Sequence, residues 1–338
     1  MLKEYQNIKK IIVSSTDKLG DTILTLPLIS KMKELFPDSK IDFLISKTNS
    51  GLFKDYPGIN SLVLYDEFKS FFQKLSFLKK EKYDLAVAAY PRFEIALLFY
   101  LARIKVRIGT GYRGYSFFFN NRVYEHRKTG DKHESDYNLN LLKPIIGDFS
   151  FEKKYYFSYK ADEFNLLSEK LSEYQFDLSS KYIIIHPGSK KSAKDWSVGN
   201  FSDLLKILLS VFPDYKIVLT GIEEESDVIS ELNIKSGDNS RTINLAGKLS
   251  LRELMILIDK SKLFISNSTG PIHIAGALNK NIIGFYPDEI PMNETRWRPL
   301  SENAVILKPE TLNGDMDSIS PLKVLEEVKK ILKNSLSK

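Results

Sequence analysis

The chain has 338 residues, about twice the usual size of one domain, which favours two domains with separate cores. Hydrophobic residues make up 43% of it and charged residues 27%, a globular balance that argues against extensive disorder. The absence of cysteine excludes disulfides, zinc ribbons and thiol nucleophiles, and only four histidines argue against a multi-histidine metal cage.

No apolar run approaches the roughly 18 residues that span a bilayer. The first residues have charges but lack the apolar core of a secretory signal. We therefore expect a cytoplasmic protein that is not integral to a membrane.

Positive charge is concentrated in the first half of the chain. Residues 1–150 have 24 Lys and Arg against 17 Asp and Glu, whereas residues 151–338 have 25 against 26. Within residues 92–128, eight cations and two acids are interleaved with apolar and aromatic residues. This pattern suits an anionic membrane surface or amphiphile, and a solvated face is an equally good interpretation. Nucleic acid ranks lower because no nucleic-acid-binding motif accompanies the stretch.

Short β-branched runs alternate with longer amphipathic segments, which is typical of βαβ units around parallel sheets, and the predicted class is α/β. The first half contains predicted strands at 10–14, 40–46, 61–65, 84–89 and 105–108, with helices near 22–36, 68–81 and 92–102. The second half contains predicted strands at 182–186, 216–220, 242–245, 263–266 and 282–285. A helix over 161–174 and a polar connection at 175–180 place the domain boundary near 160–180, and a last helix begins at Pro321.

Parallel sheets of this kind bind ligands beyond the carboxyl ends of their strands, so the loops there are the candidate sites. After the first predicted strand, Asp21 follows Gly20 at the entrance to a helix. A carboxylate in that position is more often a helix cap, and the alternative is a general base aimed into the crevice.

Three loops of the second half could hold a nucleotide. Residues 186–196 contain small residues and lysines ahead of a helix, which suits either an anion cradle or a lysine-rich surface loop. Residues 218–225 end in three acids that could cap a helix or bind ribose hydroxyls. In residues 263–278, a predicted strand is followed by Gly270, Pro271 and a helix. This pattern predicts a second phosphate-binding site near His273.

Two motifs invite other interpretations. Residues 109–114 read G-x-G-x-x-G, a dinucleotide-binding pattern, but an aromatic, turn-like segment follows in place of the helix that the pattern requires. Asp315 and Asp317 form a D-x-D, the pattern of metal-dependent sugar transferases, within a polar loop that is better explained as solvated.

Taken together, five motifs resemble glycosyltransferase family 9, the lipopolysaccharide heptosyltransferases. They are LGD at 19–21, HPGS with KDW at 186–196, LTG with Glu at 219–225, NLAGKLSLREL at 244–254 and SNSTGPIHIAGAL at 266–278, and HESDYNLNLL at 133–142 also suits the family. The resemblance runs almost end to end and implies a GT-B fold, with two Rossmann-like domains facing a central cleft. It implies an acceptor-binding domain at 1–165, a nucleotide-sugar-binding domain at 175–320, and a helix at 321–338 that packs back on the first.

The resemblance also implies an inverting, metal-independent transfer of heptose from ADP-heptose to a lipopolysaccharide core or related saccharide, with no cofactor. It assigns catalysis to Asp21 as general base and to Lys194, which neutralises charge on the leaving group. The implied donor-binding residues are Ser189, Glu225, Ala246, Gly247, Lys248, Ser268, Thr269, Gly270 and His273. The basic stretch would meet the lipid-linked anionic acceptor through Arg92, Arg107, Arg113 and Arg122, at the inner face of the cytoplasmic membrane.

One residue departs from the family pattern. Ser268 stands where the family commonly has Asp before Thr-Gly, and a hydroxyl can hydrogen-bond but has no charge. The transferase class survives this change, whereas the sugar, the nucleotide and the acceptor stay open. The alternatives are a related transferase with another nucleotide sugar, a non-catalytic binder of nucleotide sugar or anionic lipid, and a nicotinamide dehydrogenase.

Overall fold

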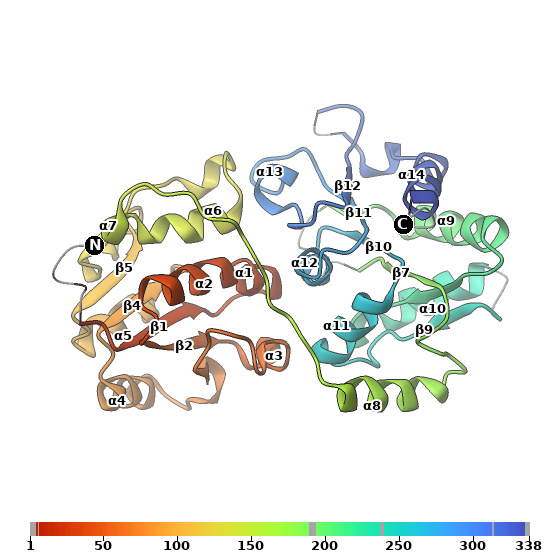
Figure 1. Ribbon diagram of the computed structural model, residues 1–338. Coiled ribbons are helices and arrows are strands. Elements are labelled where there is room, and N and C mark those ends of the chain that lie inside the picture. Colours follow the sequence, from red (N-terminus) through yellow and green to blue (C-terminus); the bar gives the residue numbers. More distant parts are fainter. Residues whose placement is uncertain (1–4, 6, 189–193, 237–239, 313, 335–338) are drawn as a thin grey trace. The chain divides into compact units, whose positions relative to one another are not determined.

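The computed structural model describes residues 5, 7–188, 194–236, 240–312 and 314–334. The chain forms two compact units, Met1–Tyr156 and Phe157–Lys338, each built around one six-stranded parallel sheet with helices against it (Figure 1). Within the described residues, none of the helices has the length and apolar character needed to cross a membrane.

The first unit has the strand order β3-β2-β1-β4-β5-β6, so the order reverses between β1 and β4. This is the doubly wound arrangement that places a ligand crevice beyond the carboxyl ends of the strands next to the reversal. Its strands are β1 (Lys10–Ser15), β2 (Lys40–Ile45), β3 (Ser61–Leu64), β4 (Leu85–Ala88), β5 (Val106–Thr110) and β6 (Asn121–Val123). Its helices are α1 (Leu19–Ile23), α2 (Leu26–Leu35), α3 (Lys47–Ser50), α4 (Phe71–Glu81), α5 (Phe93–Leu101), α6 (Glu134–Leu139) and α7 (Lys143–Ile146).

The second unit repeats the same plan with the order β12-β11-β10-β7-β8-β9, which reverses between β7 and β10. Its strands are β7 (Tyr182–His186), β8 (Lys216–Leu219), β9 (Thr242–Asn244), β10 (Leu263–Asn267), β11 (Ile282–Phe285) and β12 (Ala304–Leu307). Its helices are α8 (Ala161–Ser172), α9 (Val198–Val211), α10 (Ser226–Ser236), α11 (Leu251–Lys260), α12 (Gly270–Ala277), α13 (Glu294–Trp297) and α14 (Pro321–Asn334).

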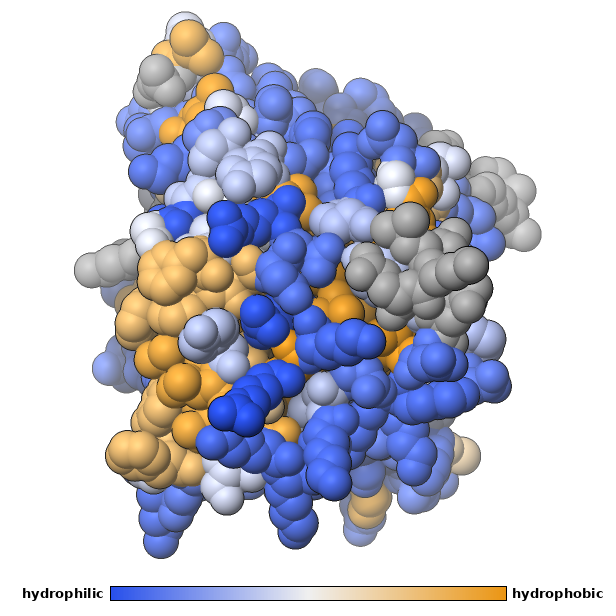
Figure 2. Space-filling view, turned by 90° about the vertical axis from the view of Figure 1, so that its left-hand side faces the viewer, coloured by the Kyte–Doolittle hydropathy of each residue, from blue (hydrophilic) through white to orange (hydrophobic). Residues whose placement is uncertain are grey.

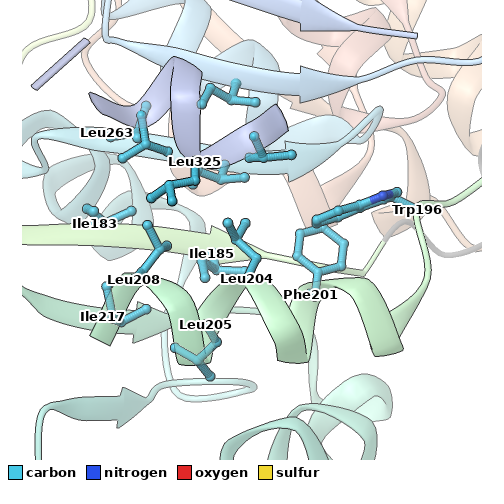
Figure 3. Close-up of a cluster of buried hydrophobic side chains, with 14 of the residues drawn as sticks. Ile183, Ile185, Trp196, Phe201, Leu204, Leu205, Leu208, Ile217, Leu263 and Leu325 are labelled. Atoms are coloured by element: carbon cyan, nitrogen blue, oxygen red, sulfur yellow. The ribbon is translucent and has the colours of Figure 1, made fainter. Parts of the chain in front are cut away.

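The core of the second unit is formed where the apolar faces of α9 and α14 pack against the sheet. α9 begins where the Ser197 hydroxyl accepts a hydrogen bond from the Asn200 amide, and its apolar residues recur at helical spacing, so they share one face. Figure 3 shows Phe201, Leu204 and Leu208 of that face beside the strand residues of the sheet. The last helix, which the resemblance placed against the first domain, has its buried residues in this same core: Val324, Leu325, Val328 and Leu332.

The predicted elements are largely present, with the following differences. The predicted helix at 22–36 is two helices, α1 and α2, because Pro27 has no amide hydrogen to donate and stands at the start of the second one. α1 therefore begins at Leu19 and includes Asp21 in its first turn. The edge strands β6 and β12 and the short helices α3, α6, α7 and α13 were not predicted.

Candidate active site

Asp21 lies just beyond the carboxyl end of β1, half-buried in the first turn of α1. Two threonines fix the backbone around it. The Thr22 hydroxyl donates to the Lys18 carbonyl at 3.0 Å, and the Thr25 hydroxyl donates to the Asp21 carbonyl at 2.8 Å. The position of the Asp21 carboxylate is thus set by a short, internally bonded turn at the edge where ligands bind such sheets.

The HESDYN segment, residues 133–138, lies far from Asp21 in the sequence but contacts the end of α1. The Asn138 side-chain amide donates to the Leu24 carbonyl at 3.2 Å, and Arg127 holds Asn138 at 3.1 Å. Arg127 also forms an ion pair with Glu134, whose side chain is fully buried. Because a buried ion pair is costly to break, this motif fixes the junction between α1 and α2, directly after the helix that contains Asp21.

Arg92 is the predicted acceptor residue that lies beside this turn. It follows the carboxyl end of β4, and its guanidinium is 3.6 Å from the Asp17 carboxylate and faces the rings of Tyr65 and Tyr90. Burial, together with a hydrogen bond to Asp17, raises the pKa of Tyr90 to about 12. Tyr90 is therefore a neutral donor at ordinary pH, and it helps to keep Asp17 in place next to Arg92.

The other three predicted acceptor arginines occupy different places. Arg113 is exposed in the loop after β5. Arg107 lies within β5 and donates to the Phe118 carbonyl at 2.8 Å, and Arg122 lies within β6 and donates to the Phe119 carbonyl at 3.1 Å. Main-chain carbonyls thus occupy two of the four guanidinium groups, and Arg92, Arg107 and Arg122 contact different parts of the unit.

Aromatic packing explains the glycines of the G-x-G-x-x-G stretch. A Cβ atom on Gly109 would lie 2.5 Å from the ring of Phe119, and one on Gly111 would lie 2.4 Å from the ring of Tyr124. Both distances are far below van der Waals contact, so each glycine leaves room for a ring of its own unit. A 3₁₀ turn, η4 (Ser116–Phe118), follows in place of the long helix that a dinucleotide site needs.

In the second unit, Glu225 lies where the ends of β7 and β8 meet. A Cβ on Gly188 would be 2.0 Å from its carboxylate oxygen Oε2, and one on Gly221 would be 3.1 Å from the same atom. The Ile222 amide also donates to this oxygen, at 3.2 Å. The carboxylate is half-buried, and the two glycines leave it room to lie against the backbone at the carboxyl ends of the strands, where an acid can bind ribose hydroxyls.

A second acid of the same turn, Glu223, packs on the predicted base pocket, and nothing in the sequence distinguishes it from its neighbours. A Cβ on Gly247 would be 1.8 Å from Glu223 Oε2, and Gly247 has a positive φ of 69° that favours glycine. The Gly247 amide donates to the Gly221 carbonyl at 2.9 Å, which joins the loops after β8 and β9. Ala246 is buried beneath this junction, and Lys248 is exposed beside it.

His186, at the end of β7, is a structural residue of this edge. Its Nδ1 lies 3.0 Å from the Thr220 hydroxyl at the end of β8. Burial lowers the pKa of His186 to about 4, so the imidazole is neutral at ordinary pH. A neutral ring that bonds a neighbouring loop ties the two strand ends together beneath Glu225.

Asn267, which the sequence reasoning overlooked, joins both ends of the predicted diphosphate loop. Its side-chain amide donates to the Pro187 carbonyl at 2.7 Å, and its carbonyl oxygen accepts from the Trp196 amide at 2.9 Å. Ser189, between these ends, lies outside the described residues. Lys194 is half-exposed and pairs with Glu289 of the loop after β11 at 2.7 Å, so one cation of the loop is held by a carboxylate from a neighbouring strand end.

The last predicted donor residues open α12, which follows β10. Thr269 is the residue before the helix, Pro271 is in its first turn, and the His273 side chain is buried. Ser268 and the buried Tyr286 are within hydrogen-bonding reach, and burial raises the pKa of that tyrosine far above its usual value. Ser268 therefore presents a hydroxyl that is already part of a protein network, next to Thr269 and Gly270.

The D-x-D motif has a structural role in this fold. Asp317 accepts hydrogen bonds from the Ser197 amide at 2.9 Å and from the Asn200 side chain at 3.0 Å, and Asp315 accepts from the Asp317 amide at 3.0 Å. These bonds fix the start of α9. Across the described ranges, no group of three or more His, Cys, Asp and Glu side chains is arranged to hold a metal ion.

The role of Asn267 can be tested by donor binding. Asn267→Ala removes two buried hydrogen bonds worth about 1 kcal/mol each, so the Kd for the nucleotide-sugar donor that the resemblance predicts should rise by about tenfold or more. Asn281→Ala is the matched control, because Asn281 also donates to a main-chain carbonyl, that of Lys262, at the opposite edge of the same sheet. Calorimetric titration of both variants measures the effect; equal affinities would show that Asn267 does not position the loop.

Comparison with known proteins gives a consistent result. The sequence profile of glycosyltransferase family 9 (heptosyltransferase) matches residues 71–319. Lipopolysaccharide heptosyltransferase 3 of Escherichia coli is 29% identical over 298 residues, which cover 85% of each chain. Lipopolysaccharide heptosyltransferase 1 of Campylobacter coli is also 29% identical, over 82% of this chain and 83% of that protein.

Solved structures agree on the fold. The ADP-heptose lps heptosyltransferase II of E. coli superposes with a TM-score of 0.83 at 22% identity, over 97% of this chain and 99% of that one. A glycosyl transferase family 9 protein of Veillonella parvula DSM 2008 gives a TM-score of 0.82 at 19% identity, over 96% and 97% of the two chains. At these identities the likeness establishes the fold, which is GT-B.

Proposed function

Because the chain belongs to glycosyltransferase family 9, and is a glycosyltransferase, we propose that it transfers heptose from ADP-heptose to a lipopolysaccharide core. The single observation that carries the donor assignment is the Glu225 carboxylate set against Gly188 and Gly221. An acid at the carboxyl ends of two neighbouring parallel strands can accept hydrogen bonds from both hydroxyls of a ribose. We take the identity of the sugar, the nucleotide and the acceptor from the heptosyltransferases to which the chain is similar.

The donor is held by the second unit. Glu225 accepts from the ribose, and the loops with Ala246, Gly247 and Lys248 line the base. Ser189, Lys194, Ser268, Thr269 and Gly270 meet the diphosphate, and His273 faces the sugar from the first turn of α12. Main-chain amides at the start of a helix of this length favour the negative charge of a diphosphate, which supports this assignment.

Two side chains take part in the proposed reaction: Asp21 as the general base and Lys194 as the cation that stabilises the leaving group. The Asp21 carboxylate takes the proton of the acceptor hydroxyl as its oxygen attacks the anomeric carbon from the face opposite ADP. A new glycosidic bond forms, the bond between that carbon and the diphosphate oxygen breaks, and the configuration inverts. Lys194 stabilises the charge that develops on the leaving diphosphate, a role that a fixed cation fills without a metal ion.

The acceptor is held by the first unit. Arg92, beside the turn that carries Asp21, and Arg113, in the loop after β5, bind anionic groups of the core saccharide. Arg107 and Arg122 add positive charge to the same unit, although their guanidinium groups are bonded to main-chain carbonyls. A lipid-linked acceptor places the enzyme at the inner face of the cytoplasmic membrane.

The donor assignment is tested by thermal unfolding with ADP-, UDP-, GDP- and CDP-linked sugars, ADP-heptose among them. A ligand at a hundred times its Kd stabilises the folded state by about 2.7 kcal/mol, which raises the Tm by a few degrees. We expect the largest shift with ADP-heptose and a smaller one in Glu225→Gln.

A preference for another nucleotide would leave the chain a glycosyltransferase but change its donor. This outcome is worth testing because Ser268 stands where the family commonly has Asp. No shift with any donor would contradict the proposal and favour the non-catalytic alternative.

A further inference from the structure

α5 of the first unit is apolar on all sides, and part of it is not covered. Glu94 is its only charged residue. Ile95, Ala96, Leu98 and Phe99 are buried, whereas the side chains of Phe93 and Tyr100 remain 55% and 48% exposed. A helix without a polar face is normally buried on every side. The outer side of α5 is therefore more exposed to solvent than is usual for a helix of this composition.

The 3₁₀ turn η4 extends this apolar area. Phe117 is 63% exposed, and its ring centroid lies 4.3 Å from that of Phe118. The Phe118 ring in turn contacts Phe93 and Tyr100 of α5, with centroids 6.1 and 5.2 Å apart. We call the set formed by Phe93, Tyr100, Leu101, Phe117 and Phe118 the aromatic surface. Hydrophobic residues lie together beside strongly hydrophilic ones on the face of the first unit in Figure 2.

The segment that contains Phe117 is fixed by contacts with β5 and β6. The Phe119 ring is fully buried and packs so closely on Gly109 that no Cβ would fit there. Arg107 and Arg122 donate to the carbonyls of Phe118 and Phe119 from the two strands that flank the turn. A fixed, exposed phenylalanine that the core does not need points to a binding surface.

The charges around the aromatic surface select its partner. Residues 69–122 include eleven Lys and Arg and three Asp and Glu. Arg103 and Lys105, immediately after α5, are exposed, as are Arg113 and Arg122. The one acid on α5, Glu94, is paired with Lys74 at 2.8 Å and accepts from the Tyr65 hydroxyl at 2.6 Å. The rim is therefore positive, which complements an anionic surface.

We propose that the aromatic surface and its basic rim dock the first unit onto an anionic lipid bilayer. The aromatic rings enter the headgroup region, and the basic side chains contact lipid phosphates. This inference deepens the proposed function and rests on it for the lipid-linked acceptor. Phe93 directly follows Arg92, which lies beside Asp17, so the docked surface adjoins the edge of the sheet where the acceptor is expected.

Flotation with vesicles tests the proposal. The full chain should bind vesicles of phosphatidylcholine mixed with phosphatidylglycerol at low salt, bind pure phosphatidylcholine at least tenfold more weakly, and dissociate as salt rises. Phe93→Ser/Phe117→Ser should lower the partition coefficient on the anionic vesicles by at least tenfold, and Arg103→Gln/Lys105→Gln by about tenfold. Leu166→Ser/Leu322→Ser, which changes two exposed apolar side chains of the second unit, should bind like the wild type.

Transfer assays separate this proposal from the proposed function. Phe93→Ser/Phe117→Ser should keep the wild-type Tm shift with donor and the wild-type rate on a delipidated core acceptor, and lose at least tenfold in rate on the same core embedded in anionic vesicles. Equal vesicle binding by this variant and the wild type, or no vesicle binding by the wild type, would overturn the docking surface. Absence of transfer to both acceptors, with vesicle binding intact, would overturn the proposed function and leave the surface standing.

Discussion

Replacing Asp21 with Asn is expected to lower kcat by about 10²–10⁴-fold and to leave the Kd for ADP-heptose unchanged. Asn keeps the size of the side chain but cannot accept the proton that the acceptor hydroxyl must lose. The donor assignments all lie in the second unit, whereas Asp21 lies in the first, so donor affinity should not depend on it. Turnover assays and calorimetric donor titration on the same preparation measure the two quantities.

Asp38→Asn is the matched control. Asp38 is an exposed aspartate of the first unit in the turn before β2, at the opposite edge of the sheet from Asp21. Its replacement should leave kcat, KM and the Tm as in the wild type. If Asp21→Asn turns over at the wild-type rate, Asp21 is not the base, and the helix-capping role that its position in the first turn also suits would be the better explanation.

Replacing Lys194 with Ala is the second large effect that we expect. The loss of one fixed donor to developing charge typically costs about 10²–10³-fold, and we expect kcat/KM to fall by that amount. Lys194→Arg should recover part of the loss because it keeps the positive charge. Glu289→Gln should show a smaller decrease, since Glu289 pairs with the Lys194 ammonium and so acts on the diphosphate only through it.

Lys206→Ala controls for the loss of a surface lysine. Lys206 is half-exposed on α9 and pairs with Asp203 at 3.4 Å, so it resembles Lys194 in exposure and in having a carboxylate partner. Steady-state kinetics with varied donor compares the two. A wild-type kcat/KM in Lys194→Ala would show that another group stabilises the leaving diphosphate.

The fold was predictable because both halves repeat one pattern. The strands β7 and β11 are rich in isoleucine and aromatic residues, and their predicted bounds match the structure. The edge strand β6 escaped prediction because two of its three residues, Asn121 and Arg122, are polar and leave no apolar run, whereas β12 is a short apolar run that was overlooked. The early start of α1 also escaped it, since Lys18 and Leu19 offer no side-chain cap.

The site was predictable only in part, because spacing along the chain does not reveal contacts between loops. Glu225 follows Gly221 in a recognisable motif, yet its approach to Gly188 depends on the order of β7 and β8 in the sheet. Asn267 looked like one small polar residue among several, and only the fold shows that it bonds both Pro187 and Trp196. Arg107 and Arg122 looked free in sequence, whereas main-chain carbonyls of the η4 segment engage them.

The most direct test of the proposed function is a transfer reaction followed to its product. Purified protein is incubated with ADP-heptose and truncated lipopolysaccharide cores, with and without a metal chelator, and the product is analysed by mass spectrometry and by NMR of the new glycosidic bond. We predict that one heptose is added, with inverted anomeric configuration, equally with and without the chelator, and that Asp21→Asn forms almost none. Retained configuration, or no transfer by protein that binds ADP-heptose, would contradict the proposed inverting transfer.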